Sequence, residues 1–203
     1  SGAIKGTSLV MVSSGGDLNL SGKGLTQNTS DASTVVLSAQ RDLVLNQSSA
    51  ASSAGVGGQV GLNAGRNITI GSDAEVSANG NVQLSADGTL DLTSSSVKSA
   101  IANVSLLAAN GINLNSSTVT GKQVQLETGA MFKETNAPIA VTNSILWGVD
   151  QTTVISSGAL TTAKTVLRRG GADAADGGIA LASAANMSLN ETTIRAGDTT
   201  QGA

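Results

Sequence analysis

Two aspartates four residues apart, Asp87 and Asp91, are the first candidates for acid–base chemistry in this sequence. Glycoside cleavage needs two carboxylates that face the same bond. Asp91 stands between Leu90 and Leu92, so strand alternation turns it outward into a strip of Ser, Thr, Asn and Gln. One carboxylate in such a strip is typical of a solvated face. A polysaccharide-active β-helix enzyme would need a second carboxylate on the same groove.

Other catalytic and metal chemistry is limited by residues that the chain lacks. The 203 residues include neither His nor Cys, which excludes His-based triads, Cys nucleophiles and Cys/His zinc sites. The Gly- and Asp-rich segment 170–178 is similar to a calcium-binding repeat, but it occurs once and with the wrong spacing. We therefore predict a protein that is not an enzyme, with no catalytic residue, metal site or cofactor.

Binding chemistry is concentrated in a few side chains. Phe132 and Trp147 are the only aromatic residues, and Arg168 and Arg169 form a basic pair. Trp is a frequent interface anchor, and binding residues concentrate on loops of rigid scaffolds. These four residues are therefore candidate binding residues, and the two arginines could meet a sulfated glycan or an acidic surface. The alternative is that both aromatics pack onto the scaffold and that both arginines lie on a solvated edge.

The elements that position these residues follow from a repeat. Apolar residues recur 20 to 28 residues apart, each followed by another six places later. The first set is Val12, Leu37, Leu62, Leu84, Leu106, Leu126, Val154 and Leu181. Inside each unit, apolar and other residues alternate with the period of two that is typical of β-strands. With so few aromatics, the core must consist of Val, Leu, Ile and Ala.

A third apolar position follows five or six residues after the second pair, at Leu25, Val76, Val97, Val119 and Ile194. Each unit is therefore expected to hold three short strands joined by turns. No unit could bury its apolar face alone, so successive units must stack. The repeat predicts an all-β fold, a parallel β-helix of about eight coils, with coil spacings of about 4.8 Å.

Two interruptions are expected within one domain that covers residues 1–203. After Leu126 the second apolar pair is missing unless Ile139 and Val141 are that pair, displaced by a longer turn near 127–138. Leu146 then follows at the position of a third strand. A Gly-rich, charged segment near 168–178 reads as a second long, exposed turn.

Short polar residues precede the second strand of each unit. Asp17, Asp42, Asn67 and Thr89 occupy this position, and such side chains can bond the turn backbone or one another as a ladder. Asp17 stacked on Asp42 would be a like-charge pair, which is tolerable only where it is solvated.

Charge and hydropathy exclude some partners. The net charge is −3, with scattered charges and no basic stripe that could follow a phosphate backbone, so nucleic acid is not expected. The sequence contains no run of 18 or more apolar residues, which is the length that a membrane-spanning helix needs.

The repeat units resemble the haemagglutinin repeats of filamentous adhesins exported by two-partner secretion. The resemblance rests on units such as Gly61 to Ile70 (GLNAGRNITI) and Gly80 to Thr93 (GNVQLSADGTLDLT), and it extends from Val10 to Ile194. This group includes filamentous haemagglutinin and the toxins of contact-dependent growth inhibition. The chain lacks the Asn-Pro-Asn motifs of the family's secretion domain, so it is similar to an internal repeat segment.

The resemblance implies that the parallel β-helix is right-handed and that the protein is extracellular, displayed at the surface of a Gram-negative cell. The function that it implies is structural and adhesive, in a secreted filament that displays a binding or toxin tip. The partners would be a receptor or glycan on a host or neighbouring cell, and an outer-membrane transporter during export. The alternative is a recognition module that binds a glycan or receptor through the interruptions at 127–178; an enzyme is the third reading.

Overall fold

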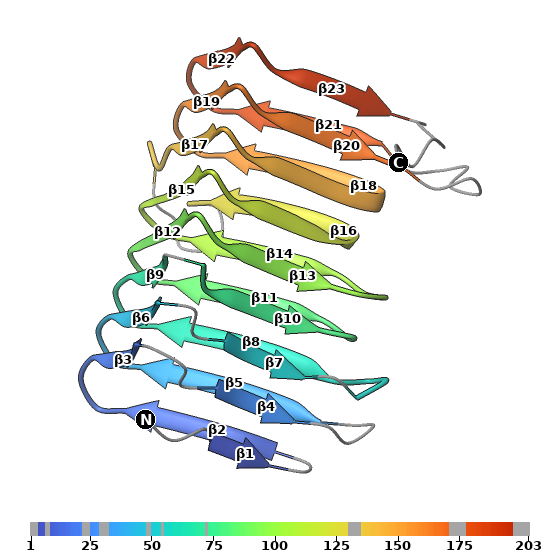
Figure 1. The fold of residues 1–203 in the computed structure, drawn as a ribbon. Helices are drawn as coiled ribbons and strands as arrows, with labels where there is room; N and C mark the ends of the chain where they lie inside the picture. The colour runs from blue at the N-terminus through green and yellow to red at the C-terminus, as the bar shows by residue number, and fades with distance from the viewer. Residues whose placement is uncertain are drawn as a thin grey trace.

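The computed structural model describes residues 4–6, 9–21, 25–28, 33–47, 50–53, 55–71, 73–129, 135–170 and 178–196. All regular elements in these ranges are β-strands, and their pairings are parallel. The chain winds upward from β1 to β23 (Figure 1). The prediction of an all-β, parallel solenoid is confirmed.

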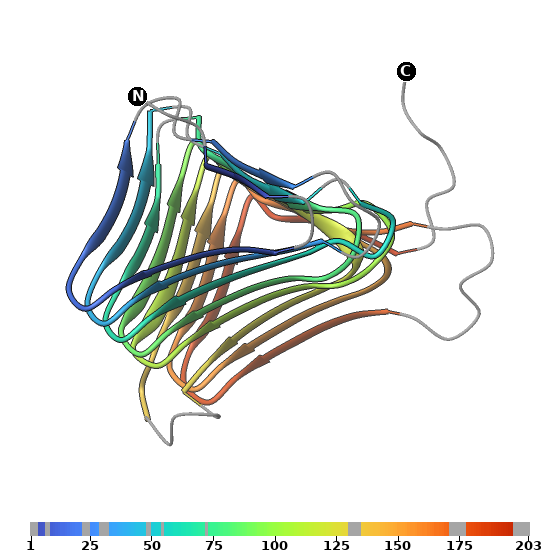
Figure 2. The same cartoon turned by 90° about the horizontal axis from the view of Figure 1, so that it is seen from below.

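Three longitudinal faces, A, B and C, make up the solenoid, and they form the sides of a triangle when viewed along the axis (Figure 2). Face A consists of β2 (Leu9–Ser14), β5 (Thr34–Ala39), β8 (Gln59–Ala64), β11 (Val82–Ala86), β14 (Val104–Ala108), the second halves of β16 (Thr118–Thr128) and β18 (Ile145–Ser156), and β21 (Ile179–Ser183). Face B is an eight-stranded sheet. It consists of β3 (Leu18–Ser21), β6 (Leu43–Asn46), β9 (Ile68–Ile70), β12 (Thr89–Thr93), β15 (Gly111–Asn115), β17 (Ile139–Thr142), β19 (Leu160–Ala163) and β22 (Met187–Asn190).

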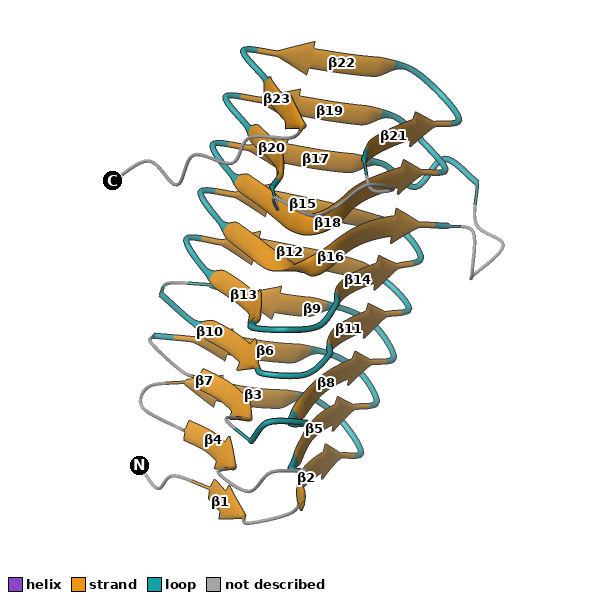
Figure 3. Ribbon diagram, turned by 90° about the vertical axis from the view of Figure 1, so that its right-hand side faces the viewer, coloured by secondary structure: helices purple, strands orange, loops and turns teal. Residues whose placement is uncertain are grey.

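Face C carries the third strand of each winding (Figure 3). It consists of β1 (Ile4–Gly6), β4 (Leu25–Asn28), β7 (Ala50–Ser53), β10 (Glu75–Ala78), β13 (Ser96–Ser99), the first halves of β16 and β18, β20 (Val166–Arg169) and β23 (Thr193–Ala196). No helix long and apolar enough to cross a membrane occurs in the part of the chain that the structure describes.

The core is a set of apolar columns parallel to the axis. On face A, one column contains every residue of the first predicted apolar set: Val12, Leu37, Leu62, Leu84, Leu106, Leu126, Val154 and Leu181. Leu37, Leu62, Leu84 and Leu106 are fully buried. Alternation sends their sequence neighbours outward, so each winding contributes the same narrow layer of aliphatic side chains.

Face B confirms how the first interruption is resolved. Ile139 lies in register with Ile112, and Val141 with Leu114, so β17 replaces the missing apolar pair. Both residues are fully buried. The displaced pair expected at Ile139 and Val141 is therefore in place. Of the longer turn expected near 127–138, β16 extends through Thr128, and residues 130–134 are outside the described residues.

The inward column of face C runs through Ala51, Val76, Val97, Val119, Leu146, Leu167 and Ile194. The prediction is wrong for Leu25, because Leu25 is in register with Ala50 and the following Thr26 is in register with Ala51. The error is an offset of one residue, and it arises because an apolar residue was expected at a position where the chain has Thr.

The corner between faces B and C has a regular construction that the sequence reading missed. In each winding whose corner lies within the described ranges, one residue has a positive φ there, and none of these is Gly: Gln47, Asp73, Ser94, Ser116, Asn143, Lys164 and Glu191. In most windings the next residue is a Ser or Thr. Ser95 Oγ lies 3.3 Å from Ser117 Oγ, and Ser144 Oγ accepts a hydrogen bond from Ser117 N at 3.0 Å. The hydroxyls therefore satisfy buried backbone groups at the corner.

Two windings differ from the expected pattern of three short strands. β16 and β18 each run through the corner between faces C and A as one long strand. Val119 and Val124, both inward, are five residues apart, whereas Val97 and Val104 are seven apart, so β16 has no room for a loop. A register shift between Gly121 and Gln123 turns the strand instead.

In β18, Thr152 stabilises the corner between faces C and A through hydrogen bonds. It occupies the position of Val124 in the neighbouring strand, yet it is fully buried. Its Oγ1 accepts a hydrogen bond from Gly148 N at 2.9 Å and donates one to Arg168 O at 2.8 Å. A valine could make neither bond, which explains the one polar residue in this column.

Candidate functional site

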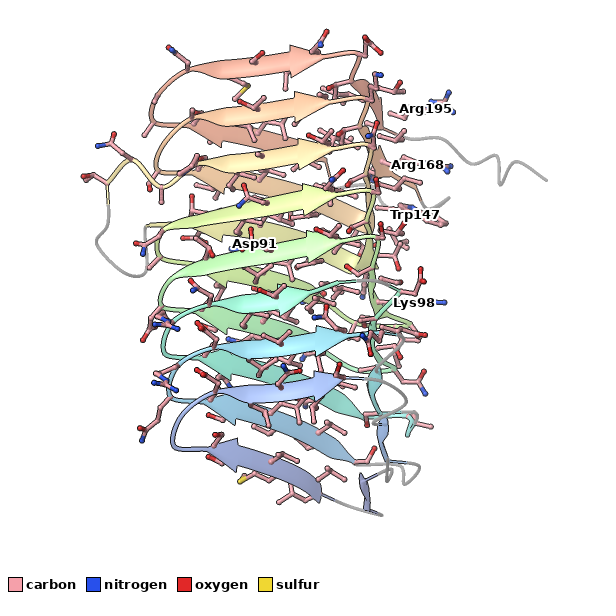
Figure 4. All side chains as sticks on the ribbon, turned by 60° about the vertical axis from the view of Figure 1, so that its left-hand side comes forward. Asp91, Lys98, Trp147, Arg168 and Arg195 are labelled. Carbon is pink, nitrogen blue, oxygen red and sulfur yellow. The ribbon has the colours of Figure 1, made fainter. Side chains whose placement is uncertain are left out.

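Five outward side chains of face C form a column that we call the basic strip: Lys98, Thr120, Trp147, Arg168 and Arg195. Each lies in register with the next, on β13, β16, β18, β20 and β23. Neighbouring residues of a ladder are about 4.8 Å apart, so a strip about 19 Å long carries three cations and one indole. Figure 4 shows its four labelled members one above another along one edge of the solenoid.

The strip is a direct consequence of strand alternation. Each member immediately follows an inward apolar residue of face C, as Trp147 follows Leu146 and Arg168 follows Leu167. Leu146 and Leu167 are fully buried, so the next side chain must point outward. The residues of the strip are separated by 21 to 27 positions in the sequence, and stacking alone brings them together.

Trp147 and Arg168 are in direct contact. The guanidinium carbon of Arg168 lies 5.1 Å from the centre of the Trp147 ring, which is within the range of a cation–π interaction. Trp147 is half-buried. Its Nε1 is screened from solvent and has no hydrogen-bond partner among the residues that the structure describes. The indole therefore has one face covered by a cation and a polar atom left unsatisfied.

A hollow of about 360 Å³ lies on the other side of the indole. It is lined by Ser96, Lys98, Ser99, Ala100, Thr118, Thr120, Gly121, Trp147 and Val149. Lys98 and Trp147 stand at its two ends because the small Thr120 separates them in the column. None of the lining residues carries a negative charge.

The predicted pair Arg168–Arg169 is divided by the structure. Strand β20 extends through both residues, so neither lies in the turn expected near 168–178, and residues 171–177 of that segment are outside the described residues. Arg168 joins the strip, whereas Arg169 Nε donates a hydrogen bond to Asp150 O at 3.2 Å. Lys122 lies 3.7 Å from the Asp150 carboxylate. Trp147 also lies on a strand instead of a loop, and Phe132 is outside the described residues.

Asp91 has the outward position predicted for it, inside a neutral polar ladder. Its carboxylate accepts hydrogen bonds from Asn113 Nδ2 at 2.6 Å and from Thr89 Oγ1 at 3.0 Å. Its neighbours in the column are Thr69 and Asn113. The column thus places no second carboxylate next to Asp91, and the bond from Asn113 ties adjacent windings together.

The corner between faces A and B holds the predicted polar ladder. Asp42 N donates to Asp17 Oδ1, Asn67 N donates to Asp42 Oδ1, and Thr89 N donates to Asn67 Oδ1, at 2.9 to 3.3 Å. In each of these pairs, the ladder side chain of one winding accepts a hydrogen bond from the backbone N–H of the next winding.

Two arginines, which the sequence reading missed, relieve the repulsion within this ladder. Arg41 lies 2.9 Å from Asp17, and Arg66 is paired with Asp42. The hydrogen bond from Arg66 is the main cause that lowers the pKa of Asp42 to about 2, against an opposing contribution from burial. The pKa of Arg66 is raised by the same contact. The stacked aspartates are therefore neutralised by ion pairs as well as exposed to solvent.

Two further hollows carry weaker chemistry. One, of about 370 Å³, follows face A and has no charged lining residue; its amides are Gln59, Asn81, Gln83, Asn103, Gln123 and Gln125. The other contains Asp73 and Glu75 with four serines. No group of three or more His, Cys, Asp or Glu residues that could hold a metal ion occurs within the described ranges.

No family model, curated protein or solved structure matches this chain. The resemblance to haemagglutinin repeats therefore stays a prediction from residue patterns. Of the four predicted binding residues, the structure brings Trp147 and Arg168 together, and it adds Lys98 and Arg195. The signal for both additions was present in the sequence, because each directly follows the third apolar position of its unit.

Proposed function

We propose that the chain is a structural and adhesive segment of a large secreted filament at the surface of a Gram-negative cell. In this role it carries a binding or toxin tip away from the cell. The observation that supports the proposal most is the continuity of the apolar columns, since each winding templates the next one. Stacked parallel ladders give a stiff rod, and the largely polar outward residues keep it soluble.

The proposal includes finer features of the winding and of its surroundings. The winding is right-handed, with about eight coils, and the eight strands of face B support this number. The parent protein crosses the outer membrane through a dedicated transporter and meets a receptor or glycan on a host or neighbouring cell. The repeat pattern described above motivates each of these features.

Surface location is the part of the proposal that a direct experiment can reject. Antibodies raised against the purified chain should label intact source cells, and gold particles should lie outside the outer membrane in electron micrographs. A strain without the gene is the control. Labelling that occurs only after the cells are permeabilised would contradict the proposal.

A recognition module is the second candidate, and the basic strip favours it. A spacer needs no ordered contact between Trp147 and Arg168 at its surface, yet these two side chains stack, and Trp147 borders a hollow. Incubating the purified chain with a glycan array and with cultured cells separates the two candidates. Binding that is lost in the Trp147→Ala variant supports a recognition module. If the chain binds neither the glycans nor the cells, only the spacer hypothesis stands.

A further inference from the structure

We propose that the hollow between Lys98 and Trp147 binds one carboxylate-bearing sugar residue of an acidic glycan. This inference rests on the recognition candidate and deepens it, because it names the class of ligand. The site consists of the indole of Trp147 at one end, the ammonium group of Lys98 at the other, and hydroxyl groups between them.

The dimensions of the hollow fit a single sugar ring. Lys98 and Trp147 are two ladder steps apart, which corresponds to about 10 Å between their strands. Thr120 is the one residue between them in the column, and the adjacent Gly121 has no side chain. The volume of about 360 Å³ lies near the lower limit for small-ligand sites, which is about 300 Å³.

The lining chemistry selects for an anion with an apolar face. Lys98 is exposed and supplies the positive charge, while Ser96, Thr118 and Thr120 supply hydroxyl groups. Trp147 and Val149 supply apolar surface at the opposite end. A sugar acid matches this arrangement, because its C–H face packs on the indole while its carboxylate reaches the ammonium group.

Arg168 gives the indole its fixed position. It lies against the ring on the β20 side, whereas the hollow lies on the β16 side, where β13 and β16 supply most of the lining. The stacking limits rotation of the ring before a ligand arrives, which reduces the entropy lost on binding.

The remaining charges of the strip fit a polymer better than a monosaccharide. Arg168 and Arg195 continue the column beyond Trp147, at further steps of about 4.8 Å. The nearby carboxylate of Asp150 lies 3.7 Å from Lys122, which offsets its charge. A second acidic residue of the same glycan would therefore meet positive charge, so oligouronides should bind more tightly than a single uronate.

Fluorescence of the purified chain tests the site directly. Trp147 is the only tryptophan and there is no tyrosine, so all of the tryptophan emission comes from the indole that borders this hollow. Titration with unsulfated oligogalacturonate should change the emission in a saturable way. Matched neutral oligosaccharides and sodium acetate should leave it unchanged, since the first lacks the anion and the second lacks the ring.

Two variants and one control establish where the ligand binds. Lys98→Met should weaken oligogalacturonate binding at least tenfold, and Thr120→Phe should abolish it by filling the hollow. Lys164→Met is the control, because Lys164 is an exposed lysine at the corner between faces B and C, and its binding should equal that of the wild type. Circular dichroism spectra that match the wild type confirm that each variant is folded.

Each outcome has a defined meaning. The inference fails if Lys98→Met binds as the wild type does, if neutral oligosaccharides bind equally well, or if an acidic peptide such as oligoglutamate competes fully. If the glycan array shows binding only to neutral glycans or to cells, the recognition candidate stands and this inference alone falls. If neither the glycan array nor the fluorescence titration shows binding, both the recognition candidate and this inference are rejected.

Discussion

Replacing Leu92 by Ala should destabilise the chain far more than replacing Leu189, although both residues belong to the same inward column of face B. Leu92 is 1% exposed and is stacked between Ile70 and Leu114. Leu189 is 43% exposed and stacks on Thr162 on one side. The two substitutions remove the same atoms and differ mainly in whether a winding is stacked on both sides.

The magnitudes follow from burial. A buried Leu→Ala change costs about 2–5 kcal/mol through lost transfer energy and the cavity that remains. We expect about 3.5 kcal/mol for Leu92→Ala. At Leu189 about half of the side chain already meets water and the vacated space is open to solvent, so we expect about 1 kcal/mol. The difference of about 2.5 kcal/mol is large enough to measure.

Urea unfolding followed by circular dichroism and by Trp147 emission measures both changes. With a slope of about 2 kcal/mol per molar urea, the midpoint of Leu92→Ala should fall about 1 M below that of Leu189→Ala. Coincidence of the two signals shows whether the array unfolds as one unit. Equal shifts for the two variants would refute the argument that burial between stacked windings stabilises the fold.

Two other predictions concern the corner between faces A and B and the outer surface of face A. The pKa of Asp42 falls from 3.8 to about 2, mainly because of its hydrogen bond from Arg66, so the stability that this pair contributes is full above about pH 4 and is lost as the pH falls through about 2. The difference in melting temperature between the wild type and Asp42→Asn should therefore shrink as the pH is lowered from about 4 to about 2. A difference that stays constant over this range would contradict the assignment. Gly88→Ala should lower the free energy of unfolding, measured by urea titration, by more than about 2 kcal/mol, because the new Cβ would lie 2.6 Å from the carbonyl oxygen of Arg66. Gly61→Ala is the control. A Cβ at Gly61 meets nothing within 4 Å, so the free energy of unfolding should change by less than about 1 kcal/mol.

The apolar columns were predictable because they arise from local alternation repeated many times. A period of two within strands and a period near 22 between windings left few ways to bury Leu84, Leu106 and their equivalents. The displaced pair, Ile139 and Val141, was found by the same logic. A register error of one residue occurred at Leu25, where the expected apolar position is held by Thr26.

The basic strip was harder to predict, because charge that is scattered in the sequence becomes ordered only by stacking. Lys98, Arg168 and Arg195 are separated by at least 27 residues, and no local window contains two of them. The ion pair between Arg66 and Asp42 was missed for the same reason, since their contact spans 24 residues. Side-chain geometry, including the cation–π contact of Trp147, depends on rotamers that residue spacing does not specify.

The first and last described strands lie at opposite ends of the axis (Figure 1), so a pull on the chain termini acts along the ladder hydrogen bonds. Under tension the terminal winding should peel away first, while the windings behind it stay loaded but intact. One winding of 22 residues, as from Leu62 to Leu84, would release about 75 Å of extended chain at about 3.4 Å per residue. Between a cell and a fixed target, such a rod would lengthen in steps and dissipate a sudden load, and force spectroscopy should record a sawtooth with that increment.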